Sequence, residues 1–186
     1  MNSIELNTER LLIRERLSDD AKEVSQYNQD KDFWQYTTIP VVPPTLESTQ
    51  EFINDCIEKN NADPRLFYGF SIVKKSPNKI IGEISLIIKD AKAKKAMFSY
   101  GLSPYFHGKG YMTEALEEVI KFGFNDLCLK RIYAYCYPKN KGSSCVMEKC
   151  GMKCEGTLRA NSFVRGEYCD DIYYGILDTD YKKQKG

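Results

Sequence analysis

Three strand-like segments in direct succession, followed by a glycine-bearing loop and an amphipathic helix, constrain the fold of this chain most. The segments FYGFSIVKK, KIIGEISLIIKD and KAMFSYGLSP cover residues 67–75, 79–90 and 95–104. They are rich in β-branched and aromatic residues and are separated by turn-like stretches, which is typical of strands. HGKGYMTEAL, residues 107–116, follows, and from Gly110 apolar residues recur with helical spacing. This order predicts a sheet that leads through a tight loop into a helix.

Further strands and helices are predicted on both sides of this segment. Helices are expected at 18–29, with Ser18 as N-cap, at 45–61 and within 140–151. Strands are expected at 5–16, 130–138, 153–164 and 168–178, the last two forming a hairpin around Arg165 and Gly166. Strands outnumber helices, and a run of strands precedes a strand–helix–strand–helix segment. The predicted fold class is therefore α+β, a mixed sheet with helices on its faces.

Size, composition and charge exclude several classes of protein. A chain of 186 residues is most simply one domain, 1–186, and its 42% apolar and 28% charged residues are ordinary for a globular protein. A net charge of +1 gives no global field that attracts nucleic acid or an anionic membrane. No stretch approaches the roughly 18 apolar residues of a membrane span, and the N-terminus lacks a signal-peptide core. We expect a cytoplasmic protein without a nucleic-acid or membrane partner.

The cysteines predict neither disulfides nor a metal site. There are seven, an odd number, none of them forms a CxxC pair, and the chain has a single histidine. Zinc sites require closely spaced pairs of such ligands, so no metal is expected. Free, reduced and mostly buried thiols, Cys145 among them, fit this pattern best.

The glycine-bearing loop has two interpretations. Helix N-termini expose unpaired N–H groups and carry partial positive charge, so they bind phosphates. Glycine lacks the Cβ that holds an anion away from those donors, and Gly108 and Gly110 lie at that place. The alternative is a strand-to-helix turn without a ligand. The loop is neither a P-loop nor the dinucleotide fingerprint, because GxxxxGK[ST] and GxGxxG are both absent.

Several motifs in order along the chain resemble one enzyme family. HGKGYMTEAL, then NKGSSCVMEKCGMKCEGTLR, then GEYCDDIYYGIL resemble the GNAT superfamily of acetyl-CoA-dependent N-acetyltransferases, with the closest likeness to its ribosomal-protein-alanine acetyltransferase branch. The opening LNTERLLIRERLSDD and the segments IIGEISL and FSYGLSPYFHGKGY are similar to the same branch. The resemblance covers nearly the whole chain. It implies a mixed, mostly antiparallel sheet with a splayed central strand pair and helices on both faces.

The resemblance also implies which residues hold acetyl-CoA. Main-chain N–H groups of the loop would bind the pyrophosphate, and the loop consists of His107, Gly108, Lys109, Gly110, Tyr111 and Met112. His107 and Met112 depart from the family pattern [QR]xxGx[GA]. Main-chain groups around Leu102 and Ser103 would bind the pantetheine arm, and Asn140 and Ser143 match the family's NxxS beside the far end of the coenzyme.

The implied reaction is attack of a neutral amine on the acetyl thioester, followed by departure of the thiolate. The Leu102 N–H is the candidate oxyanion donor, and Ser143 or Tyr137 would meet the thiolate. Glu83 is the candidate base, because a carboxylate within the apolar strand IIGEISL is costly unless it is used or paired. Alternatively, Glu83 simply faces solvent. Glu114 is expected to cap or pair within its own helix.

Two functions from different classes follow. The first is an N-acetyltransferase that acts on a primary amine, either a protein N-terminus or a small molecule. The second is a coenzyme A-binding regulatory or scaffold protein that keeps the fold and has no turnover, because fold alone does not fix function. Trp34 and Tyr36 are candidates for the wall of the acceptor pocket. The sequence leaves the acceptor open, as well as the choice between a monomer and a homodimer.

Overall fold

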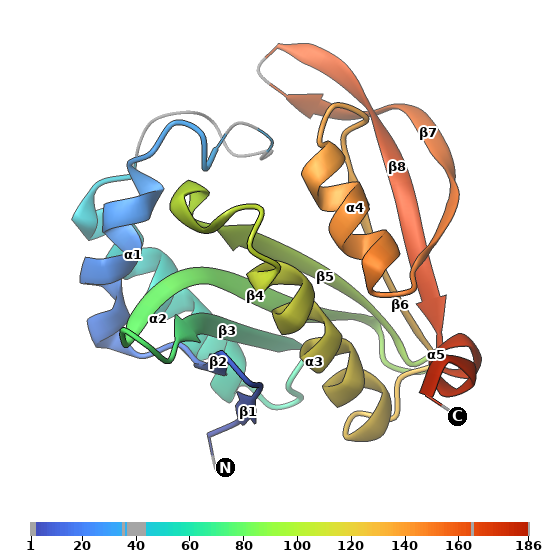
Figure 1. The fold of residues 1–186 in the computed structure, drawn as a ribbon, viewed down its shortest axis with the longest axis horizontal. Helices are drawn as coiled ribbons and strands as arrows, with labels where there is room; N and C mark the ends of the chain where they lie inside the picture. The colour runs from blue at the N-terminus through green and yellow to red at the C-terminus, as the bar shows by residue number, and fades with distance from the viewer. Residues whose placement is uncertain (1–2, 35, 37–43, 165, 186) are drawn as a thin grey trace.

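The computed structural model describes residues 3–34, 36, 44–164 and 166–185, whose eight strands form one mixed sheet (Figure 1). The strands are β1 (Glu5–Asn7), β2 (Leu11–Glu15), β3 (Phe67–Lys74), β4 (Lys79–Asp90), β5 (Lys95–Leu102), β6 (Arg131–Cys136), β7 (Lys153–Val164) and β8 (Glu167–Leu177). The helices are α1 (Ala21–Asn28), α2 (Leu46–Asn61), α3 (Tyr111–Asn125), α4 (Lys141–Lys149) and α5 (Asp178–Lys185), with short 3-10 turns η1 (Ser18–Asp20) and η2 (Pro104–Phe106).

The sheet is antiparallel except at its centre. Its order is β1-β2-β3-β4-β5-β6-β8-β7, and only β5 and β6 run parallel among these neighbours. The two strands pair over Lys95–Met97 and Arg131–Tyr133 and then diverge, so that the second half of β5 has no strand on that side. This confirms the predicted mixed, mostly antiparallel sheet with a splayed central pair.

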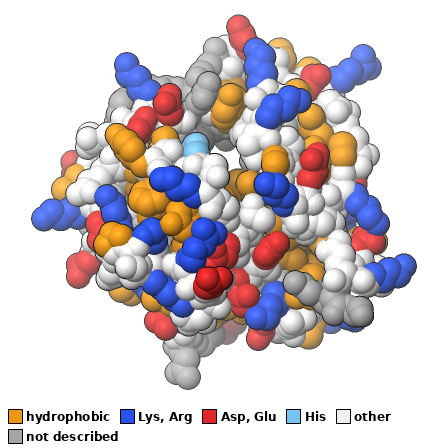
Figure 2. All heavy atoms as spheres, viewed as in Figure 1, with side chains coloured by type: hydrophobic (Ala, Val, Ile, Leu, Met, Phe, Trp, Pro, Cys, Tyr) orange, Lys and Arg blue, Asp and Glu red, His pale blue; other side chains and the backbone are white. Residues whose placement is uncertain are grey.

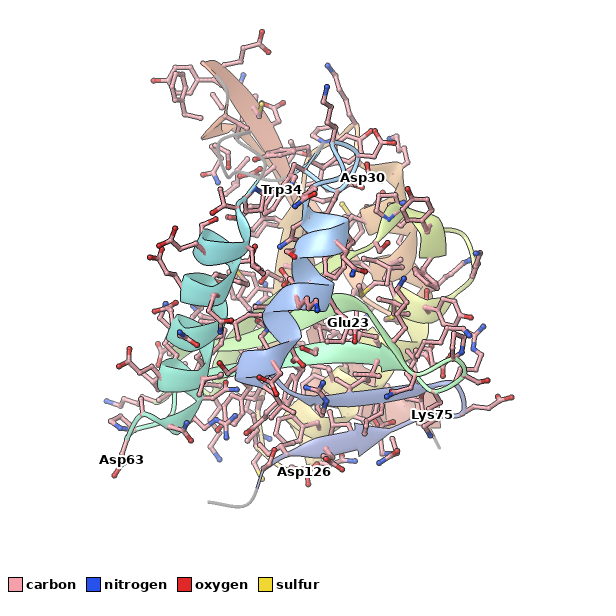
Figure 3. All side chains as sticks on the ribbon, turned by 90° about the vertical axis from the view of Figure 1, so that its left-hand side faces the viewer. Glu23, Asp30, Trp34, Asp63, Lys75 and Asp126 are labelled. Carbon is pink, nitrogen blue, oxygen red and sulfur yellow. The ribbon has the colours of Figure 1, made fainter. Side chains whose placement is uncertain are left out.

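Helices cover both faces of the sheet, as predicted (Figures 1 and 3). Alternation along the strands directs side chains into two cores: β3 places Phe70 and Ile72 in the core under α3, and Val73 in a smaller core under α1 and α2. Glu23 of α1, labelled in Figure 3, accepts a hydrogen bond of 2.9 Å from the Ile80 N–H and so fixes α1 on β4. Within the described ranges, no helix has both the length and the apolar character of a membrane span.

The ends of the chain differ from the predicted elements. The opening strand predicted at 5–16 is a hairpin of β1 and β2, because Thr8 turns the chain by hydrogen bonding to both backbone groups of Leu11. Ser18 does not cap α1: it begins the turn η1, and the Asp20 carboxylate accepts the Leu17 N–H instead. Helix α5 was not predicted, since it is short and mostly polar.

Burial differs from the prediction for the cysteines. On α2, Ile53 and Cys56 are buried, whereas Phe52 is 41% exposed where its side of the helix lines a cavity. All seven cysteines are free, but only three are buried, namely Cys56, Cys136 and Cys150. Cys145 in particular is exposed, which corrects the prediction of a buried thiol there.

A buried carboxylate joins the first helix to the sheet. Asp20 is 4% exposed and accepts two hydrogen bonds from Arg14, at 2.7 and 2.8 Å, one from the Leu17 N–H and one from the Ser71 hydroxyl at 2.7 Å. Burial raises the pKa of this carboxyl, but the hydrogen bonds outweigh burial, and the net result is a lowered pKa.

We expect Asp20→Asn to lower the free energy of unfolding at pH 7 by about 3 kcal/mol, because it leaves the Arg14 guanidinium without its charge partner. A lowered pKa stabilises the fold above the ordinary aspartate value near 3.8, and this contribution disappears as pH falls below that value. Urea denaturation of both proteins at pH 7 and pH 3 measures the difference. Asp55→Asn, in an exposed pair with Lys59, is the control and should change the free energy by less than about 0.5 kcal/mol. If Asp20→Asn and Asp55→Asn changed the free energy of unfolding equally, the stabilising role of the Asp20 carboxylate would be contradicted.

Candidate active site

A cavity of about 1480 Å³ lies where the central strands diverge. It extends from the end of α1 and the start of α2, across β4 and β5, to the glycine loop and α4. Figure 2 shows this face hollowed near its centre, with lysine and arginine side chains and the histidine around the hollow. The predicted site residues that line the cavity are Glu83, Leu102, His107, Gly108, Gly110, Tyr111, Met112, Tyr137, Asn140 and Ser143.

Two of the predicted site residues do not line the cavity. Ser103 is 3% exposed, and its N–H donates to the Ile81 carbonyl at 2.8 Å, so this donor is engaged within the sheet. The Lys109 ammonium donates to the Tyr105 carbonyl at 2.8 Å and lies 5.5 Å from the centre of the Phe106 ring. Lys109 therefore turns back onto η2 instead of adding its charge to the loop's binding side.

The glycine loop presents bare backbone to the cavity. Gly108 and Gly110 have φ angles of +72° and +79°, which L side chains rarely adopt, and nothing lies within 4 Å of the position of a Gly108 Cβ. The first helical hydrogen bond of α3 runs from the Glu114 N–H to the Gly110 carbonyl, so the preceding N–H groups have no acceptor within the helix. The Met112 side chain packs into the core at 4% exposure, away from this open backbone.

Arg10, at the start of β2, holds the loop in place. Its guanidinium donates to the Lys109 carbonyl at 3.0 Å and lies 4.5 Å from the centre of the Tyr111 ring. Glu114 accepts hydrogen bonds from the Thr8 hydroxyl at 2.6 Å and from Arg10. Burial raises the Glu114 pKa, but these hydrogen bonds outweigh it and the pKa is lowered. The prediction that Glu114 pairs within its own helix was wrong, since its partners lie on the first hairpin.

The second half of β5 directs unpaired backbone groups into the gap. Leu102 lies opposite Gly82 of β4, and the Ser103 N–H bonds to Ile81. Because antiparallel hydrogen bonds alternate, the Leu102 N–H points away from β4, toward the gap beside β6. The Leu102 carbonyl is held by the His107 ring, whose Nε2 lies 2.9 Å away. A carbonyl only accepts, so His107 donates from Nε2.

Residues on both faces of the sheet line the cavity at the gap. Leu102 and Tyr100 point their side chains toward the core under α3. Gly101 and Glu83 lie on the opposite face, where the Phe33 ring occupies the place of a Gly101 side chain: a Cβ there would lie 2.7 Å from a Phe33 ring carbon. The wall of the cavity beside Leu102 is therefore built from residues on both faces of the sheet.

Glu83 is paired, and it faces the cavity. Its carboxylate lies 3.5 Å from the guanidinium of Arg16, with side-chain exposures of 23% and 3% respectively. Arg16 also stacks over the Phe52 ring at 4.9 Å and donates to the Cys56 sulfur at 2.6 Å. The buried Arg16 guanidinium gives this carboxylate a charge partner at this point of the cavity wall. The alternative that Glu83 simply faces solvent does not describe this geometry.

The start of α4 forms the opposite wall. Asn140 is the N-cap, and its side chain accepts the Ser143 N–H at 3.0 Å, so the predicted NxxS match is a helix cap in this chain. The Tyr137 hydroxyl is buried at the wall of the cavity. Burial and the nearby Asp171 charge raise the Tyr137 pKa to about 12. Tyr137 therefore keeps its proton at neutral pH.

Charge is divided between the two ends of the cavity. Three lysines line it near α4, namely Lys139, Lys141 and Lys149, together with the helix N-terminus. Two carboxylates, Asp32 and Glu83, line the end near α1 and α2. One end therefore suits an anionic ligand, and the other suits an amine.

The sequence did not reveal several of the lining residues. Trp34 and Tyr36, the candidates for an acceptor pocket, line the cavity, and Phe33, Phe52 and Tyr100 were missed. The Tyr100 hydroxyl lies 2.8 Å from the Ser143 hydroxyl. A signal for Tyr100 existed: it is two residues before Leu102, so strand periodicity places both side chains on one face.

The comparison with protein families decides the classification. A family model described as "Acetyltransferase (GNAT) domain" matches residues 10–153. The chain belongs to the GNAT acetyltransferase family. It is 31% identical over 176 residues to the uncharacterized N-acetyltransferase YnaD of Bacillus subtilis, covering 95% of this chain and 98% of that protein. The prediction of an N-acetyltransferase is thus confirmed at the level of the family.

Solved structures agree with the fold. A GNAT-family acetyltransferase from Bacillus anthracis superposes with a TM-score of 0.82 at 31% identity, covering 95% of this chain and 99% of that one. The ribosomal-protein-S5-alanine acetyltransferase of Vibrio fischeri gives a TM-score of 0.84 at 24% identity, covering 96% of this chain and 98% of that one. The likeness to the Vibrio fischeri structure supports the fold alone. That protein belongs by its name to the branch whose motifs this sequence resembles.

Proposed function

We propose that this GNAT-family chain transfers the acetyl group of acetyl-CoA to a primary amine, in the cytoplasm. One observation carries the proposal: the glycine loop and the Leu102 N–H open onto a single cavity that residues on both faces of the sheet line. Such an arrangement brings a donor and an acceptor together at one set of free backbone groups. Preorganised backbone donors of this kind polarise a carbonyl without reorganising during the reaction.

The residues present fit acetyl-CoA as the donor. The open backbone at Gly108 and the N-terminus of α3 suit a pyrophosphate, because nothing there keeps an anion from the N–H groups. Lys139 and Lys141 flank the Asn140 cap and suit further phosphate charge. Between these sites, the unpaired edge of β5 offers backbone groups to an amide-containing arm, in the manner of an added strand. When bound, acetyl-CoA supplies an activated acetyl thioester.

Each chemical requirement has a candidate residue. The Leu102 N–H would stabilise charge that develops on the thioester oxygen. Glu83, paired with Arg16, would accept the proton of the attacking amine. Ser143 or Tyr137 would donate a hydrogen bond to the departing thiolate from the opposite wall. The chain itself would position the reactants and supply one proton acceptor. It would also supply one hydrogen-bond donor for the thioester oxygen and one for the thiolate sulfur.

The acceptor end favours a cationic amine. Asp32 and Glu83 line it, while the lysines of the described lining belong to the α4 end. Phe33 and Phe52 add aromatic surface, which attracts cations as well as apolar groups. We propose an acceptor that carries a positive charge besides the reacting amine, in either a small molecule or a peptide.

A panel of amines tests the function. Release of coenzyme A thiol should accelerate with a polyamine or with a lysine-containing peptide that has a free N-terminus, and mass spectrometry should find the acetylated product. The same peptide with a blocked N-terminus and blocked lysines is the control and should give no acceleration. Coenzyme binding without acceleration by any amine would favour the alternative, a coenzyme A-binding regulatory or scaffold protein without turnover.

A further inference from the structure

Tyr100 connects the two sides of the splayed gap. Its side chain leaves β5 where β6 has already diverged, and its hydroxyl lies 2.8 Å from the Ser143 hydroxyl and 3.2 Å from the Ser143 carbonyl. Both Ser143 and Tyr100 line the cavity. The Tyr100 ring stacks on Phe98 with centroids 5.6 Å apart, which fixes the direction in which the hydroxyl points.

Either hydroxyl could donate in the 2.8 Å contact, and the single Tyr100 proton can go to the Ser143 hydroxyl or to the Ser143 carbonyl. Burial raises the pKa of Tyr100, so its hydroxyl keeps this proton at neutral pH, and we assign the proton to the shorter contact, with the Ser143 oxygen as acceptor. A serine hydroxyl has one proton and two lone pairs. When the Ser143 oxygen accepts from Tyr100, its own proton must point elsewhere, and the remaining open side of this residue is the cavity. A hydroxyl that accepts one hydrogen bond also becomes a stronger donor of the next.

We propose that Tyr100 is a positioning residue that aims the Ser143 hydroxyl at the coenzyme sulfur, an inference that rests on the proposed function. As the carbon–sulfur bond breaks, its electron pair stays on sulfur. The Ser143 O–H donates a hydrogen bond to that thiolate and keeps its proton, so no bond within the protein breaks. Tyr100 acts through Ser143 and does not touch the reacting atoms.

The thiol of bound coenzyme A provides a direct test that needs no acceptor amine. The ultraviolet absorbance of the thiolate, followed against pH, gives the pKa of the bound thiol. A hydrogen bond to the thiolate lowers this pKa, so Ser143→Ala should raise it by about one pH unit or more. Tyr100→Phe keeps the ring stack and removes only the hydroxyl, and it should raise the thiol pKa by a smaller amount. In a Ser143→Ala background, Tyr100→Phe should have no further effect.

Turnover should follow the same pattern. With a substrate amine, kcat should fall about ten-fold in Tyr100→Phe and about 100-fold in Ser143→Ala, with the double variant no slower than Ser143→Ala. Ser143→Thr keeps a hydroxyl and should retain the low thiol pKa if Tyr100 is present. Tyr105→Phe makes the same chemical change on a ring that is 74% exposed and outside the cavity lining, and should alter neither quantity.

The outcomes separate this inference from the proposed function. If coenzyme A binds normally and Tyr100→Phe leaves the pKa of its thiol unchanged, the role of Tyr100 alone is overturned. Additive effects of Tyr100→Phe and Ser143→Ala do the same, because they show that the two hydroxyls act independently. Failure of the wild-type chain to bind coenzyme A overturns the proposed function and this inference with it. Should Tyr100→Phe not fold, the comparison of Ser143→Ala with Ser143→Thr still decides whether this hydroxyl meets the sulfur.

Discussion

Replacing Gly108 by glutamate is expected to weaken acetyl-CoA binding by at least about 100-fold. Nothing lies within 4 Å of the new Cβ, so the carboxylate would have room to extend from the loop. It would then face the proposed pyrophosphate. Two like charges 5 Å apart at an effective dielectric constant of 20 repel by about 3 kcal/mol, and each 1.4 kcal/mol is about ten-fold in affinity. Titration calorimetry with acetyl-CoA measures the loss directly.

Gly166→Glu provides a matched control for this substitution. Gly166 has a φ of +85° and open space at its Cβ position, like Gly108 with +72°. Both variants therefore introduce the same charge and similar backbone strain, of about 1–2 kcal/mol, but Gly166 lies between β7 and β8, outside the cavity lining. We expect similar melting temperatures and a loss of affinity in Gly108→Glu alone. If Gly108→Glu bound acetyl-CoA as tightly as Gly166→Glu, the pyrophosphate would not lie on this loop.

The order of elements could be predicted because local patterns decide it. The β-branched and aromatic content of β3 and β4 and the helical spacing after Gly110 are both strong signals, and the structure has these elements at the predicted places. The opening hairpin was missed because a single hydroxyl, Thr8, creates its turn within an otherwise strand-like run. The boundary of α1 was missed because residues 18–20 form the turn η1, in which the Asp20 carboxylate accepts the Leu17 N–H. Arg14 holds this carboxylate, and the sequence cannot place Arg14 beside it.

The candidate site could be predicted where it consists of backbone. Glycine positions and strand ends are visible in a sequence, and Gly108, Gly110 and Leu102 do open onto the cavity. Contacts between distant side chains are not visible in the same way. Arg16, the last residue of the strand predicted at 5–16, is 5% exposed and pairs with Glu83, 67 positions along the chain. The loop's dependence on Arg10 likewise arises only in three dimensions.

Glu83→Gln is expected to lower kcat at pH 7 by about 100-fold or more, because general-base assistance typically contributes about 10²–10⁴-fold. Glutamine has nearly the same shape and keeps an oxygen near Arg16, but it does not take up a proton at neutral pH. A primary amine with a pKa near 10 is mostly protonated at pH 7, and its free fraction rises about ten-fold per pH unit. The deficit of Glu83→Gln relative to wild type should therefore shrink as pH rises toward 9, which a kcat profile over that range will measure.

Loss of the Glu83 charge also affects stability, and a second carboxylate separates the two effects. Arg16 is buried, so Glu83→Gln removes its charge partner and should lower the melting temperature. Glu15 forms a comparable pair with Arg65, at 2.6 Å and with side-chain exposures of 15% and 11%, but neither residue lines the cavity. Glu15→Gln should therefore destabilise the fold without changing kcat at any pH. If the kcat deficit of Glu83→Gln stays constant from pH 7 to 9, Glu83 acts in positioning through Arg16 and not in proton transfer. The reason is that only a missing base becomes less important as the amine loses its proton to solvent.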